Sequence, residues 1–180
     1  ESHVEADIVV GIPDSSLSAA YGYAEETGVP FEMGLIKNRY VGRTFIMESQ
    51  KLRDQGVMMK LSPIKAVIKD KRIILVDDSL VRGTTSKKIV AMMREAGAKE
   101  IHLRIACPEI IAPYFYGLDS YSADELISNR YNKDALCKHV GADTLEFLSI
   151  DGLDQSIEDV GLYLGCFNED YPTHIYESEE

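Results

Sequence analysis

The segment "RIILVDDSLVRGTTS", residues 72–86, decides how this sequence folds. It begins with an apolar run of strand length and ends that run at two adjacent carboxylates, Asp77 and Asp78. Neighbouring carboxylates repel each other, so this arrangement favours a partner that is cationic or rich in hydroxyl groups. The next residues lead into "TTSKKIVAMMREAGA", whose apolar side chains recur on one helical face. A buried strand followed by a turn and a helix is typical of an α/β unit.

The rest of the chain repeats this alternation. Strands are predicted at 7–11, 30–36, 72–78, 100–107 and 144–150. Helices are predicted at 15–28, 84–98, 122–128, 132–141 and 156–165. Alternating strands and helices predict an α/β fold, a mostly parallel sheet with helices on both faces. Ser15 or Ser16 is expected to cap the first helix and Gly28 to end it, whereas 37–70 has weak periodicity and is expected to be a functional loop or lid.

Composition restricts the possible functions. The 180 residues are 45% apolar, enough for one domain with a core, and the net charge is −11. An acidic surface argues against non-specific binding of nucleic acid or anionic membranes, and no apolar stretch approaches the ~20 residues of a membrane span. Three scattered cysteines, Cys107, Cys137 and Cys166, predict reduced thiols in a cytoplasmic protein.

Two polar stretches, 12–16 and 77–86, follow predicted strands at their carboxyl ends, where ligands bind in parallel sheets. Asp77 and Asp78 suit Mg²⁺ held through water, or the two hydroxyls of a ribose. "RGTTS" offers a glycine, three hydroxyls and the first amides of a helix, which together suit one phosphate group. Taken alone, the two carboxylates could be an ordinary acidic end of a strand, and "TTS" could be an ordinary helix cap. The combined pattern predicts a site for a ribose 5-phosphate.

"VDDSLVRGTTS" resembles the phosphoribosyl pyrophosphate (PRPP) motif of type I phosphoribosyltransferases. Together with "KNRYVGRTFI", "AGAKEIHLRIACPEI" and "PYFYGLD", it resembles the glutamine phosphoribosylpyrophosphate amidotransferase family over about residues 7–150. The resemblance implies the type I phosphoribosyltransferase fold with a flexible lid loop. It implies an enzyme that makes 5-phosphoribosylamine, glutamate and pyrophosphate from PRPP, glutamine and water, the first step of de novo purine (IMP) biosynthesis.

The resemblance also implies site residues. The loop 12–16 would cup the pyrophosphate of PRPP. Mg²⁺ is the implied cofactor, with the ligands Ser15, Asp77 and Asp78. The implied PRPP-binding residues are Asp14, Ser15, Ser16, Lys37, Tyr40, Arg43, Lys60, Arg82, Gly83, Thr84, Thr85 and Ser86. The implied catalytic residues are Arg43, Lys60, Asp77 and Asp78.

The basic loop 37–44 resembles the family's lid, and Lys60 matches a lid lysine on its far side. The alternative to a lid is that the cations of this loop simply form a solvated, charged surface. PRPP carries several negative charges, so clamping it requires cations in a site from which water is excluded. Closure would keep water from the anomeric carbon and let ammonia attack instead.

Members of this family take ammonia from an N-terminal glutaminase domain, which we expect to be absent from this sequence. We expect a phosphoribosyltransferase domain at 1–150, incomplete at its N-terminus, and a C-terminal helix with an acidic tail at 151–180. The resemblance implies a homo-oligomer inhibited by purine nucleotides. Some members bind an iron–sulfur cluster through cysteines, but this chain has Tyr114 and Tyr163 at two such positions and retains only Cys166. No cluster is therefore predicted.

Two alternatives remain open. The PRPP motif alone also fits a type I phosphoribosyltransferase for base salvage, although "KNRYVGRTFI" and "PYFYGLD" disfavour it. A non-catalytic sensor of PRPP or nucleotides could use the same fold. Release of pyrophosphate that depends on a nucleobase would favour the first alternative. Nucleotide binding that survives loss of Arg43 and Lys60, with no turnover in a full-length protein, would favour the second.

Overall fold

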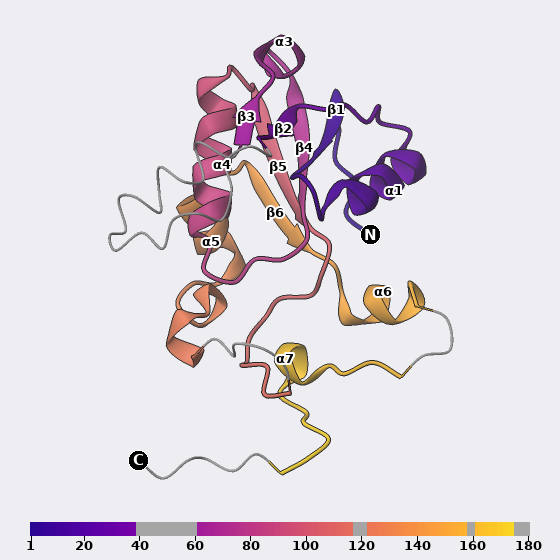
Figure 1. Ribbon diagram of the computed structural model, residues 1–180, viewed down its shortest axis with the longest axis vertical. Coiled ribbons are helices and arrows are strands. Elements are labelled where there is room, and N and C mark those ends of the chain that lie inside the picture. Colours follow the sequence, from indigo (N-terminus) through magenta and orange to yellow (C-terminus); the bar gives the residue numbers. More distant parts are fainter. Residues whose placement is uncertain (39–60, 117–121, 158–160, 175–180) are drawn as a thin grey trace.

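The computed structural model describes residues 1–38, 61–116, 122–157 and 161–174 (Figure 1). Its main sheet has four parallel strands in the order β1-β4-β5-β6. These strands are β1 (Ile8–Gly11), β4 (Arg72–Asp77), β5 (Glu100–Ile105) and β6 (Thr144–Phe147). Since Gly11 lies opposite Val76 in the register, the chain leaves β1 and β4 at the same edge of the sheet. This brings the two predicted polar stretches together.

Helices cover both faces of the sheet, as predicted (Figure 1). These helices are α1 (Leu17–Thr27) on one face, and α4 (Thr84–Glu95) and α5 (Lys133–Val140) on the other. The alternation of side chains along β4 explains the two layers. Ile73 and Leu75 lie in the core that α4 and α5 share, while Ile74 and Val76 pack with Ala20 and other small residues of α1. Every one of these β4 side chains is at most 3% exposed.

Part of the predicted lid region is regular structure. The antiparallel pair β2 (Leu35–Lys37) and β3 (Leu61–Pro63) forms a second small sheet, followed by α3 (Lys65–Ile68). The prediction of a continuous loop over 37–70 is therefore wrong for 61–68. Its periodicity is weak because each element is only three or four residues long, yet Ile68 is fully buried. Residues 39–60 lie outside the described residues.

Two predicted helices are also wrong. Residues 122–128 form two short 3₁₀ turns, η1 (Ala123–Glu125) and η2 (Ile127–Asn129), because the N–H of Ile127 donates to the carbonyl of Val81 instead of continuing a helix. The predicted helix at 156–165 is displaced: α6 (Ile150–Gln155) starts earlier, where the Ser149 hydroxyl accepts from the Gly152 N–H, and α7 (Gly165–Asn168) follows later. Within the described segments, no helix is both long and apolar enough to cross a bilayer.

An aromatic cluster joins the C-terminal segment to the chain that follows β5. The ring of Tyr163 lies 5.1 Å from that of Tyr114 and 5.0 Å from that of Tyr116, both edge to face. Backbone hydrogen bonds from 111 and 112 to the carbonyl of Cys166 run beside the cluster, and the Tyr171 hydroxyl donates to Pro113. Tyr114 and Tyr163, the two residues on which the prediction of no iron–sulfur cluster rests, are thus in direct contact.

Removal of the Tyr163 ring should release this segment locally. We expect Tyr163→Ala to lower the opening free energy of 161–171 by roughly 2 kcal/mol, because several ring contacts are lost. Hydrogen exchange measured by mass spectrometry should show faster exchange there and unchanged exchange in β4. Tyr163→Phe is the control: the buried hydroxyl has no hydrogen-bond partner among the described residues, so its removal should leave exchange unchanged. Equal protection in Tyr163→Ala would contradict this role.

Candidate functional site

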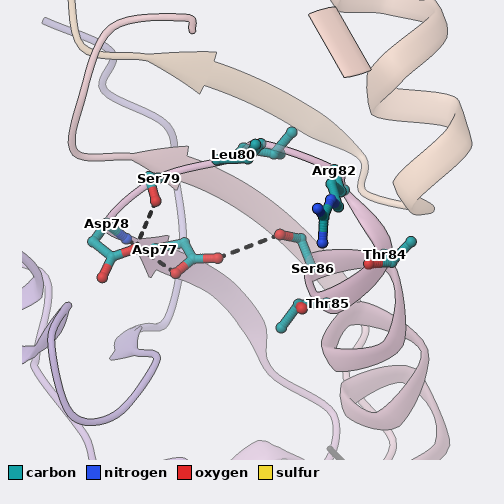
Figure 2. Close-up of a pocket in the computed structure, with 10 residues that line it drawn as sticks. Asp77, Asp78, Ser79, Leu80, Arg82, Thr84, Thr85 and Ser86 are labelled. Atoms are coloured by element: carbon teal, nitrogen blue, oxygen red, sulfur yellow. Dashed lines mark hydrogen bonds between the residues drawn. The ribbon is translucent and has the colours of Figure 1, made fainter. Parts of the chain in front are cut away.

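The candidate site lies at the carboxyl end of β4, where the chain crosses into α4 (Figure 2). A pocket of about 320 Å³ is lined by the ten consecutive residues from Asp77 to Ser86. The buried strand ends at one side of this pocket and the first turn of α4 at the other. The pocket therefore joins the two halves of the motif that the sequence singled out.

The two adjacent carboxylates have different surroundings. Asp77 is only 8% exposed, whereas Asp78 is exposed. The Asp77 carboxylate accepts hydrogen bonds from the Ser86 hydroxyl, at 3.3 Å, and from the N–H of Asp78 (Figure 2). It also accepts one from the Ser16 hydroxyl, at 3.4 Å. Ser16 occupies the cap position of α1 but does not cap it, so the predicted capping role is wrong: its hydroxyl is directed to Asp77 instead.

Burial raises the pKa of Asp77 to about 6, and the negative charge of Asp78 adds to this shift. The three hydrogen bonds lower the pKa, but they offset only part of the effect of burial. A divalent cation beside the pair would relieve both the desolvation and the repulsion. The described residues hold no group of three or more His, Cys, Asp or Glu side chains placed for a metal. Two adjacent carboxylates, one of them exposed, have a chemistry compatible with Mg²⁺, which commonly takes one or two carboxylates plus water and substrate oxygens.

Gly83, Thr84 and Thr85 form what we call the phosphate cup. Gly83 has φ of +69°, a conformation that side chains rarely adopt, and a Cβ there would lie 2.4 Å from Cδ1 of Ile127, so the Ile127 side chain would have to shift. Thr84 and Thr85 are exposed on the first turn of the 12-residue helix α4. The cup therefore combines backbone N–H groups, two hydroxyls and the positive end of a helix dipole, which suits a phosphate.

The loop after β1 lies against the end of β4. The N–H of Ile12 donates to the carbonyl of Val76, which holds the loop against the end of β4. Asp14 and Ser15 are exposed there, and the Lys37 ammonium lies 2.9 Å from the Asp14 carboxylate. The structure thus brings most of the predicted site residues to one edge of the sheet. Three of them lie outside the described residues: Tyr40, Arg43 and Lys60.

Two further residues at this edge were not predicted. Cys107 follows β5, and burial, with a contribution from nearby Asp78, raises the pKa of its thiol to about 12. That thiol stays protonated near neutral pH and is a poor nucleophile. Glu125 of η1 binds Arg82, with 2.5 Å between its Oε1 and Nη2. The sequence shows only a capping-box pattern at 122–125, because the contact with Arg82 depends on tertiary structure.

Comparison with known proteins identifies the domain. Residues 2–115 match the model of the phosphoribosyl transferase domain. The chain belongs to this family. The match includes β1, the cup and β5, and it confirms the fold class that the sequence predicted.

Among the relatives of this chain are amidophosphoribosyltransferases of bacteria and plants. The protein of Bacillus subtilis (strain 168) is 55% identical over 98% of this chain, and the chloroplastic protein of Glycine max is 54% identical over 98%. The chain spans only 38% and 32% of their lengths. A solved structure of glutamine PRPP amidotransferase from B. subtilis, complexed with ADP and GMP, superposes with a TM-score of 0.88 at 54% identity over 99% of this chain and 40% of that one. These matches confirm the resemblance to the amidotransferases.

Adding a methyl group at Gly83 should deform the cup. Gly83→Ala strains a left-handed residue and forces Ile127 to move, so we expect a loss of about 1–3 kcal/mol in the free energy of unfolding. Urea denaturation measures this loss. Gly22→Ala in α1 is the matched control, because a Cβ there meets nothing within 4 Å, and it should leave stability unchanged or slightly increased. Equal stability of both variants would contradict the packing of Ile127 against Gly83.

The buried carboxylate should also make stability depend on pH. Folded Asp77 keeps its proton up to a pKa of about 6, whereas the unfolded carboxyl releases it near its ordinary value of 3.8. The native state therefore binds more protons between these values, so this group lowers stability as pH rises from about 4 to 6. Asp77→Asn removes the effect. Relative to this variant, the wild type should lose about 2 kcal/mol between pH 4 and 7 in Mg²⁺-free buffer. A constant difference in urea denaturation across this range would contradict the shift.

Proposed function

We propose that this chain is the phosphoribosyl-transferring part of an amidophosphoribosyltransferase. It binds PRPP with Mg²⁺, and ammonia displaces pyrophosphate from C1 of the ribose to give 5-phosphoribosylamine, which begins purine synthesis. The observation that carries the proposal is the placement of the exposed Asp78 carboxylate and the phosphate cup in one pocket at the end of β4. The identity of about 55% with the B. subtilis enzyme supports the choice of reaction.

The described residues divide the binding of PRPP among themselves. The phosphate cup holds the 5-phosphate through backbone N–H groups and the hydroxyls of Thr84 and Thr85. Asp78, exposed at the rim, accepts hydrogen bonds from the ribose hydroxyls and so orients the anomeric carbon. The loop with Asp14 and Ser15 receives the pyrophosphate, and Lys37 leaves its contact with Asp14 to bind that anion.

The reaction requires no nucleophile from the protein. The attacking atom is the nitrogen of ammonia, the bond that breaks joins C1 to pyrophosphate, and the protein positions the reactants and stabilises the departing charge. Asp77 and Asp78, with Ser15, would hold Mg²⁺, which supplies positive charge to the leaving pyrophosphate. Cys107 takes no part, because its buried thiol remains protonated.

Part of the proposal concerns residues and partners that lie outside the described residues. Arg43 and Lys60 would stabilise the pyrophosphate as it leaves, and Tyr40 would contact PRPP. Ammonia would come from glutamine through a glutaminase domain. The complex of the B. subtilis enzyme with ADP and GMP supports inhibition by purine nucleotides. We further propose a cytoplasmic homo-oligomer.

Calorimetry with PRPP and Mg²⁺ tests the proposed site. The wild-type chain should bind, and the double variant Asp77→Asn/Asp78→Asn should lose at least tenfold in affinity, because ribose hydroxyls and metal lose their acceptors. Asp134→Asn on α5 removes an acidic charge outside the pocket and should bind as the wild type does. Equal binding by the double variant, or none by the folded wild type, would overturn the site. Pyrophosphate release that requires a purine base instead of ammonia would favour a salvage transferase.

A further inference from the structure

A segment far along the chain supports the back of the phosphate cup. Residues 122–130 contain the two 3₁₀ turns, and Ile127 of this segment is 5% exposed. Its side chain lies against the α-carbon of Gly83, and its N–H donates to the carbonyl of Val81 at 2.8 Å. The backbone of the loop that carries Arg82 is therefore held on both sides of that residue. The long side chain of Arg82 extends beyond these backbone contacts.

Glu125 restrains that side chain, and it is itself fixed. One carboxylate oxygen accepts a hydrogen bond from Nη2 of Arg82 at 2.5 Å. The other faces the N–H of Ser122, at 3.4 Å, in the capping box of η1. Because both oxygens have partners and Leu126 next to it is fully buried, Glu125 presents its charge from a defined position. The two residues of the pair are 43 positions apart in the sequence.

We propose that Glu125 is a positioning residue for the phosphoribosyl site, holding the Arg82 guanidinium at the rim of the phosphate cup so that a 5-phosphate meets a cation already in place. This inference rests on the proposed function, because it assigns the phosphate of the substrate to the cup. Arg82 lines the pocket together with Thr84 and Thr85 (Figure 2). An unrestrained arginine loses the freedom of several rotatable bonds when it orders on a ligand, and Glu125 reduces that loss before binding.

The exposure of the pair indicates that its effect is on binding more than on folding. The side chains of Arg82 and Glu125 are 51% and 41% exposed. Exposed ion pairs contribute little to stability. Arginine, with five N–H donors in a planar fork, can bind a carboxylate through one edge and a phosphate through another. Contact with Glu125 through one edge is therefore compatible with a phosphate bound at another.

The test is a double-mutant cycle on the affinity of the full chain for ribose 5-phosphate, measured by calorimetry. Glu125→Gln keeps an oxygen for the Ser122 N–H but removes the charge that holds Arg82. We expect roughly threefold to fivefold weaker binding, with an unchanged melting temperature. In an Arg82→Ala background, Glu125→Gln should have no further effect, because Glu125 acts through Arg82. Asp124→Asn, its neighbour in η1, is the matched control and should bind as the wild type does.

Three results would overturn the role of Glu125. Tighter binding by Glu125→Gln would mean that the carboxylate competes with the phosphate for Arg82. The same loss in the Arg82→Ala background would mean that Glu125 acts only on the backbone of the segment. No binding of ribose 5-phosphate by the wild type would mean that the cup is not a site for the 5-phosphate. Binding of the expected pattern without release of pyrophosphate from PRPP would instead support Glu125 and overturn the proposed reaction.

Discussion

Asp77 ends the central strand with its carboxylate inside the protein, and three separate parts of the chain meet there. Ser16 reaches it from the loop after β1, and Ser86 from the first turn of α4. A buried carboxylate needs such donors, since desolvation penalises its charge. These contacts set the loop after β1, the end of β4 and the start of α4 in fixed positions. The packing that buries Asp77 and raises its pKa therefore also positions the residues of the site.

The phosphate cup depends on a second constraint, which lies outside the motif. Gly83 adopts a left-handed conformation with Ile127 packed where a side chain would otherwise stand. The 3₁₀ turns at 122–129 are irregular because their backbone and side chains bond to the loop of the cup instead of continuing a helix. The contact with the loop that forms the cup therefore overrides the local preference of this segment for a helix. The ion pair between Arg82 and Glu125 belongs to the same interface.

The C-terminal segment shows how aromatic side chains can join two parts of a chain. Tyr163 packs edge to face with Tyr114 and Tyr116, and backbone hydrogen bonds to Cys166 lie alongside. Two of these tyrosines, Tyr114 and Tyr163, are the residues on which the prediction of no iron–sulfur cluster rests. That the chain carries no iron–sulfur cluster stays a prediction, resting on the residues present at those positions.

The sequence was enough to predict a strand at 72–78, which the structure has at Arg72–Asp77. It also predicted the helix that follows, the parallel α/β sheet and the pairing of carboxylates with a hydroxyl-rich turn. These features are readable because they depend on neighbours in the chain: an apolar run, a helical period and a glycine. Tertiary structure alone decided that Asp77 is buried while Asp78 is exposed, that Ser16 bonds to Asp77 instead of capping α1, and that Glu125 meets Arg82. Each of these is a contact between residues far apart in sequence, whose formation depends on the packing of whole elements and not on local propensity.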